Sequence, residues 1–244
     1  MVLLHGTPTA IEDFEPLAAA LASRHRVLIP HMPGYGRSPF DPAPYPLDNV
    51  IARLEQCLID AGISQAAFVA VSGGAYKAAA IALRGRVRVS RLALLAPVVG
   101  LDPDAAQMFR AVAAATRSGA FDPRPTWLDR MASPGLAARN PGAAGRVMAW
   151  LDAAPLSVIC GELAAVADAP DLRARLRELA CPVLVCAGTA DGAVPVAWSE
   201  DVARRAPRAT FERIDGAGHA LLIEAPDRVT GLLDDFLSRA SAAA

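Results

Sequence analysis

Residues 66–83, A-A-F-V-A-V-S-G-G-A-Y-K-A-A-A-I-A-L, join an apolar run typical of a buried strand to an alanine-rich run typical of a helix. Ser72, Gly73 and Gly74 stand at the junction of the two runs. In an open parallel sheet, ligands and reacting groups lie at the carboxyl ends of strands, where loops meet the amino ends of helices. The serine at this turn is therefore a candidate for a chemical role.

Short apolar runs alternate with longer segments of helical period along most of the chain. This alternation predicts the α/β class, with a mostly parallel, doubly wound sheet. It stops between about residues 101 and 180, where D-P-R-P, S-P-G and N-P-G interrupt several helical segments. Because that interval is too long for a connection within a sheet, we predict a helical cap (lid) at 101–180, inserted between core segments 1–100 and 181–244. The predicted strands are 2–5, 27–30, 67–71, 92–96, 183–187 and 210–214, and the predicted helices are 14–23, 47–61, 74–83, 196–205 and 226–239.

The composition favours a small-molecule substrate over a nucleic acid or a membrane surface. The chain of 244 residues has 24 basic and 25 acidic side chains, so no large field of one sign is available. Its four cysteines and four histidines lack the spacing of a zinc site, so we expect no metal, no organic cofactor, and buried free thiols. The apolar runs are shorter than the ~20 residues of a membrane span, and the amino terminus does not resemble a signal peptide. We therefore expect a cytoplasmic protein.

Four polar residues follow predicted strands at the edge where chemistry is expected. Ser72 follows 67–71, Asp191 lies in C-A-G-T-A-D-G-A-V-P, His219 lies in I-D-G-A-G-H-A, and Thr7 lies in H-G-T-P-T. A serine hydroxyl becomes a good nucleophile when a histidine takes its proton and a carboxylate orients that histidine. Ser72, Asp191 and His219 supply these groups, in the chain order of the nucleophile-elbow hydrolases.

Other interpretations of these residues stay open from the sequence alone. Asp191 precedes a glycine and could serve as a turn residue. Asp102 and Asp104 follow another strand and are rival acids, while His5 is expected to shape its own loop by hydrogen bonds. Four large apolar residues in the cap are candidates either for an acyl pocket or for ordinary packing: Trp127, Met131, Met148 and Trp150.

Five motifs in this order resemble the α/β-hydrolase family. They are L-L-H-G-T-P (3–8), P-G-Y-G-R-S (33–38), A-V-S-G-G (70–74), G-T-A-D-G-A-V-P (188–195) and G-A-G-H (216–219). The resemblance implies that Ser72 is the nucleophile, His219 the base and then the acid, and Asp191 the orienting carboxylate. It also implies that the backbone N–H groups of Thr7 and Gly73 form the oxyanion hole.

The chain departs from the family pattern in two places. Ala70 stands where the family more often has glycine, a change that the turn should tolerate. The segment 2–5 resembles the family's third strand, so the hairpin that normally precedes it is missing. Its loss would leave the strand 27–30 as an open edge. A start placed too late is our favoured explanation, and cover by a loop or by a second subunit of a homodimer is the alternative.

The serine excludes the family branches that attack through an aspartate. The leading hypothesis is therefore a serine hydrolase that cleaves carboxylic esters or lactones of a modest, largely apolar substrate through an acyl-enzyme on Ser72. One alternative is hydrolysis of a carbon–carbon bond in a vinylogous diketone, although Ala220 follows His219 where that branch usually has tryptophan. The other alternative is a non-catalytic binding module on the same fold.

Overall fold

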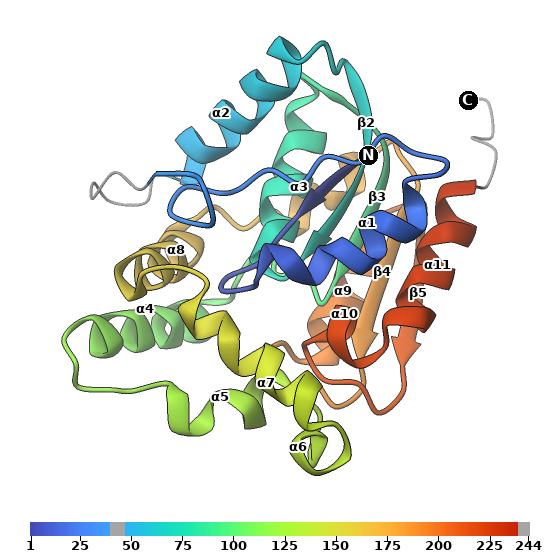
Figure 1. Ribbon diagram of the computed structural model, residues 1–244. Helices are drawn as coiled ribbons and strands as arrows, with labels where there is room; N and C mark the ends of the chain where they lie inside the picture. Colours follow the sequence, from blue (N-terminus) through green and yellow to red (C-terminus); the bar gives the residue numbers. More distant parts are fainter. Residues whose placement is uncertain (40–46, 239–244) are drawn as a thin grey trace.

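The computed structural model of the protein describes residues 1–39 and 47–238. A parallel sheet in the order β1-β2-β3-β4-β5 forms its centre, and helices cover both faces (Figure 1). This arrangement confirms the predicted α/β class and the doubly wound parallel sheet. The strands are β1 (Val2–Leu4), β2 (Gln65–Val71), β3 (Arg88–Leu95), β4 (Val183–Gly188) and β5 (Ala209–Ile214).

Each central strand is apolar on both faces because both faces are covered. Phe68 and Ala70 of β2 pack into the core shared with α2, α3 and α9, whereas Val69 and Val71 face α1 and α11. This alternation follows the two-residue period of a strand. Full burial of a side chain such as that of Phe68 stabilises the fold by roughly 1.5–3 kcal/mol. The covering helices are α1 (Glu15–Leu21), preceded by the 3-10 helix η1 (Ile11–Phe14), α2 (Leu47–Asp60), α3 (Gly73–Arg84), α9 (Val196–Arg205), α10 (Leu221–Glu224) and α11 (Pro226–Ser238).

The predicted strand 27–30 is wrong in extent. The segment forms a single parallel bridge, between Val2 and Leu28, and no strand. Both backbone polar groups of Leu28 are hydrogen-bonded to the segment of β1. Its carbonyl accepts from the N–H of Leu3 and its N–H donates to the carbonyl of Met1, both at 2.9 Å. Pro30 has no N–H to extend this pairing, and β1 itself ends at Leu4. The predicted end of the last helix, residue 239, lies outside the described residues.

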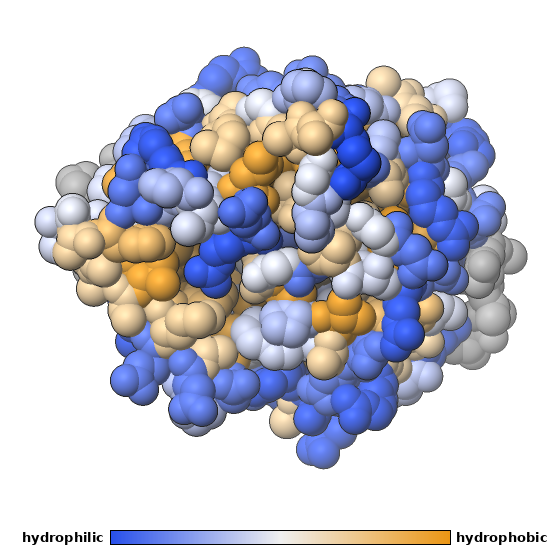
Figure 2. Space-filling model, turned by 90° about the horizontal axis from the view of Figure 1, so that it is seen from below, coloured by the Kyte–Doolittle hydropathy of each residue, from blue (hydrophilic) through white to orange (hydrophobic). Residues whose placement is uncertain are grey.

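Residues 101–180, called the cap below, are helical and contain no strand within the described chain. Asp102 and Asn140 accept from the N–H groups of Ala105 and Ala143, at 2.8 and 3.0 Å, and each is followed by a proline at the first helical position. Figure 2 views the molecule from the cap side, where apolar and hydrophilic surface are interspersed. The cap consists of α4 (Pro103–Arg117), α5 (Arg124–Met131), α6 (Leu136–Arg139), α7 (Pro141–Ala149), α8 (Leu156–Asp168) and the 3-10 helices η2 (Trp150–Asp152) and η3 (Arg173–Glu178).

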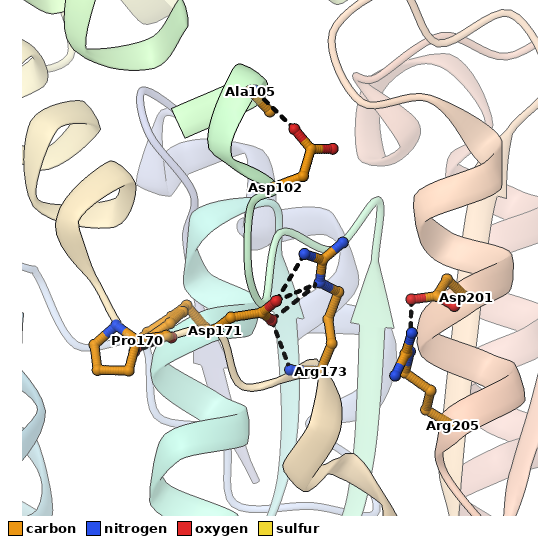
Figure 3. A network of polar contacts seen from close by, with 8 residues as sticks. Asp102, Ala105, Pro170, Asp171, Arg173, Asp201 and Arg205 are labelled. Atoms are coloured by element: carbon orange, nitrogen blue, oxygen red, sulfur yellow. Dashed lines mark hydrogen bonds and ion pairs between the residues drawn. The ribbon is translucent and has the colours of Figure 1, made fainter. Parts of the chain in front are cut away.

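The two ends of the cap lie side by side on the core. The N–H of Leu172 donates to the carbonyl of Val99 at 3.1 Å. Asp171 accepts from both the backbone and the guanidinium of Arg173, which lies below Asp102 in Figure 3. A Cβ on Gly100 would lie 1.9 Å from the Asp171 Oδ1, so a larger residue there would displace the Asp171 side chain. The entry and the exit of the cap are thus packed against each other on the core.

No single helix among residues 1–39 and 47–238 is long and apolar enough to cross a membrane. One pair, Pro141–Asp152 with Leu156–Asp168, reaches that length and composition when its two helices, bent by 85°, are counted together.

Candidate active site

Ser72 occupies a strained turn between β2 and α3. Its φ of 50° and ψ of −121° lie outside the regions that side chains with a Cβ favour. Three backbone hydrogen bonds hold it there: its N–H donates to Leu95, at 2.9 Å, and its carbonyl accepts from Ala75 and Val98, at 3.0 and 3.2 Å. The surrounding sheet and helix therefore stabilise a conformation that the serine would not adopt alone.

Small residues let the turn approach the neighbouring strand. A Cβ on Gly74 would lie 2.6 Å from the carbonyl oxygens of both Leu4 and His5, and these backbone atoms cannot easily move. A Cβ on Gly6 would lie 2.9 Å from that of Ser72. At Gly73 the contact is looser, 3.3 Å from the Thr7 Oγ1. The loop that follows β1 is thus packed directly against the serine turn.

The structure brings His219 and Asp191 together. The Nδ1 of His219 lies 2.8 Å from the Oδ2 of Asp191, and the two side chains are 3% and 0% exposed. The other carboxylate oxygen, Oδ1, accepts from the N–H groups of Ala193 and Val194, each at 2.8 Å. Asp191 therefore both shapes its turn and contacts the histidine.

The rival acids have other surroundings. Asp102 caps the amino end of α4, and Asp104 lies exposed in the first turn of that helix. The carboxylate that contacts His219 is thus that of Asp191, which the sequence placed first among three candidates.

A cavity of about 110 Å³ lies above the serine turn. Thr7, Ser72, Gly73 and His219 line it at the core side. The cap supplies an apolar wall that includes Met108, Phe109, Phe121, Trp127, Leu163 and Val166. Four of the five predicted site residues therefore share one cavity, and the fifth, Asp191, contacts it through His219.

The large apolar residues of the cap divide between the two roles left open by the sequence. Trp127 and Met131, both on α5, line the cavity. Met148 packs in the cap core, and the Nε1 of Trp150 donates to the Oδ2 of Asp13 at 2.5 Å. The difference arises because α5 faces the serine turn, whereas η2 packs on η1 of the core.

The cap also contacts the loop that carries His219. The carbonyl of Met131 accepts from the N–H of Ala220 at 3.0 Å. Glu224 joins the two segments: its Oε1 accepts from the N–H of Gly218 at 3.1 Å, and its Oε2 accepts from the N–H of Ser133 at 3.0 Å and from the hydroxyl of the same residue. The histidine loop and the cap are therefore both anchored by Glu224, which is half-buried.

His5 lies fully buried beneath the Thr7 loop. Its Nδ1 lies 3.0 Å from the Gly6 carbonyl, and its Nε2 lies 3.2 Å from the Met32 N–H. A carbonyl accepts and an N–H donates, so the neutral ring protonated at Nδ1 satisfies both contacts. Burial lowers the pKa of His5 from 6.5 to about 4. The expected local role of His5 in shaping its loop is therefore confirmed.

Acid is expected to destabilise the fold through His5. The unfolded chain binds a proton at His5 below about pH 6.5, whereas the folded chain binds it near pH 4, so stability falls as the pH decreases through this window. The difference of about 2.5 pKa units corresponds to a loss of about 3 kcal/mol. Urea unfolding of the wild type and of His5→Asn at pH 7, 5.5 and 4.5 measures it.

The variant His5→Asn should be less stable at pH 7 but should lose less stability on acidification. His25, which lies partly exposed beyond α1, offers a control: His25→Asn should keep the wild-type pH dependence. Equal pH dependence in the wild type and His5→Asn would contradict this prediction.

Among the described residues, no three His, Cys, Asp or Glu side chains are grouped as a metal site would require. All four cysteines are free thiols, and burial raises the pKa of Cys186 on β4 to about 12. The expectation that all are buried is wrong for Cys57, which lies exposed on α2, and holds only in part for Cys181, which is half-buried.

Several residues near the site were not singled out from the sequence. Glu224 and Ser133 belong to unremarkable segments, and nothing local indicates that they meet. Lys77 and Glu162 carry a usable signal, since each is a charge in the middle of a helix whose other charged residue, Arg84 or Asp168, stands at the carboxyl end. Such a charge in a buried helix requires a partner.

Comparison with known proteins gives consistent results along the chain. The sequence pattern of the alpha/beta hydrolase family matches residues 1–232. A pimeloyl-[acyl-carrier protein] methyl ester esterase of Xanthomonas campestris pv. campestris is 32% identical over 98% of this chain and 94% of its own.

Two solved structures have the same architecture. A thermophilic esterase from Thermogutta terrifontis superposes with a TM-score of 0.88 and 26% identity, covering 97% of this chain and 88% of that chain. An enol-lactonase from Burkholderia xenovorans LB400 superposes with a TM-score of 0.86 and 25% identity, covering 98% and 90%.

Proposed function

Because the chain belongs to the α/β-hydrolase family, we propose that it cleaves carboxylic esters or lactones of a modest, largely apolar small molecule through an acyl-enzyme on Ser72. It is a hydrolase whose relatives include esterases and a lactonase. The observation that carries the proposal is the 2.8 Å contact between His219 and Asp191, at a cavity that Ser72 also lines.

In the first half of the reaction, the Oγ of Ser72 attacks the substrate carbonyl and its proton passes to the Nε2 of His219. The charge that develops on the imidazole is stabilised by Asp191, whose Oδ2 faces the opposite ring nitrogen. His219 then donates the proton to the leaving alkoxide, which departs as the alcohol. An ester of Ser72 with the acyl group remains.

The negative charge on the carbonyl oxygen would be accepted by the N–H groups of Gly73 and Thr7. Gly73 is the first residue of α3, so its N–H has no acceptor within the helix. The loop of Thr7 is held in shape by Thr9, whose hydroxyl oxygen accepts from the Gly6 N–H at 2.9 Å. Donors that are fixed before the reaction stabilise the transition state without reorganisation.

In the second half, a water molecule gives a proton to His219 and attacks the acyl carbon. The tetrahedral species then collapses, Ser72 regains its proton from His219, and the carboxylic acid leaves. The wall of Met108, Phe109, Trp127 and other apolar residues favours an apolar acyl chain, and Arg130 is the one permanently charged side chain among the described residues of the lining. The methyl ester named for the Xanthomonas relative is consistent with a small alcohol portion.

The test is hydrolysis of p-nitrophenyl esters from acetate to decanoate by the wild type. We expect hydrolysis of short and medium chains, with kcat/KM falling at decanoate because the cavity of about 110 Å³ is small. A fluorophosphonate probe should label Ser72, which peptide mass spectrometry would locate. A folded protein that neither hydrolyses any ester of the series nor reacts with the probe would refute the proposal and favour a binding module.

A further inference from the structure

A buried ion pair joins the cap to α3, the helix that follows Ser72. The Nζ of Lys77, on α3, contacts the Oε1 of Glu162, on α8, and both side chains are 0% exposed. Lys77 is the sole lysine of the sequence, beside 23 arginines. Removing two charges from water is costly, and replacing such a pair by apolar residues is often neutral or stabilising. Stability alone therefore does not explain this pair.

The pair lies directly behind the residues proposed for catalysis. Lys77 follows Gly73 by one helical turn, so the two occupy the same face of α3. On α8, Glu162 directly precedes Leu163, and Leu163 and Val166 line the cavity. The contact thus connects the wall of the cavity with the helix that carries the proposed oxyanion donor.

Glu162 accepts from a second donor, the hydroxyl of Tyr35, at 2.9 Å. Burial alone would raise the pKa of Glu162, but the charge and the hydrogen bond of Lys77, with smaller contributions from Thr7 and His5, together hold it below the usual range. Of the other titratable groups, His5 is also near, and it is neutral above about pH 4. The carboxylate is therefore charged and held from both sides at neutral pH.

We propose that Lys77 and Glu162 are positioning residues that fix α8 against α3 and thereby limit the length of the acyl group that the cavity accepts. An apolar helix face can pack in several slightly shifted positions, whereas a shift of α8 would strand a buried charge on each helix. This inference rests on the proposed esterase function.

The test uses the double variant Lys77→Met/Glu162→Gln, which removes both charges. The amide oxygen of the glutamine can still accept from the Tyr35 hydroxyl. Because no charge is stranded, the double variant should fold, and thermal unfolding verifies this. We expect the preference in kcat/KM for hexanoate over decanoate to fall about tenfold, because a displaced α8 admits the longer chain. The single variant Glu162→Gln, which strands the charge of Lys77, should lose more stability than the double variant.

The matched control is Asp168→Asn on the same helix. Asp168 pairs with Arg110 of α4, but the two side chains are 65% and 51% exposed, so the pair should contribute little. This variant should keep the wild-type acyl preference. A general loosening of the protein would alter kcat for all esters alike and would leave the hexanoate-to-decanoate ratio unchanged.

Hydrogen exchange of the α8 peptide, measured in wild type and double variant without substrate, separates the two proposals. We expect exchange of α8 amides about tenfold faster in the double variant. If the wild type hydrolyses no ester, the proposed function fails and exchange alone decides whether the pair holds α8. A folded double variant with unchanged exchange and unchanged acyl preference would overturn the inference.

Discussion

Ser72→Ala should lower kcat for p-nitrophenyl esters by roughly 10⁴–10⁶-fold, because the substitution removes the oxygen proposed to attack the carbonyl. KM should change little, since the apolar wall that binds the acyl group is untouched. The variant should also be as stable as the wild type or more stable, because alanine fits the space of serine. Steady-state kinetics and urea unfolding measure the two effects.

A second buried serine provides the control for this substitution. Ser199 on α9 is 0% exposed and does not line the cavity, so Ser199→Ala should keep wild-type kcat. Fluorophosphonate labelling should disappear in Ser72→Ala and persist in Ser199→Ala. Ester hydrolysis at the wild-type rate by Ser72→Ala would show that Ser72 is not the nucleophile.

Asp191→Asn should lower kcat by about 10⁴-fold. The amide carries no charge to stabilise the protonated His219. Its NH₂ group can also face the Nδ1 of His219, which must itself carry a proton when His219 acts as the base at Nε2. The turn should survive, because the amide oxygen can still accept from the N–H groups of Ala193 and Val194. The loss should therefore appear in kcat at nearly unchanged stability.

Asp102→Asn is the matched control for the acid. Asparagine caps helices about as well as aspartate, so α4 should still begin at Pro103. The enzyme should therefore keep its activity. Kinetics of both variants at pH 8 would decide between the two acids. A loss for Asp102→Asn as large as that for Asp191→Asn would contradict the assignment of the carboxylate.

The strands and helices of the core could be predicted because their causes are local. The run from Phe68 to Val71 is apolar at every position, which indicates a strand covered on both faces, and Gly73 and Gly74 mark the turn that follows. The prediction of a strand at 27–30 was wrong because the pairing of this segment depends on tertiary structure, namely on the length of β1 beside it. Composition alone would favour a strand there.

The proposed site residues could be named because each follows a strand, and parallel strands end at one edge of the sheet. The sequence order alone left Asp102 and Asp104 as rivals of Asp191, because several loops reach that edge. The contact of 2.8 Å between Asp191 and His219 depends on the docking of two loops that are 28 residues apart. No pattern within either loop contains that information.

By itself, the sequence determined the α/β class, the strand-turn-helix unit at Ser72 and the chain order of the candidate residues, because these follow from periodicity and turn chemistry over a few neighbouring residues. Tertiary structure alone decided which cap residues line the cavity and that Lys77 meets Glu162, 85 residues away. The physical reason is that a helix of the cap can bury its apolar face in several orientations. The side chains of the core that pack beneath the helix determine which of these orientations it adopts.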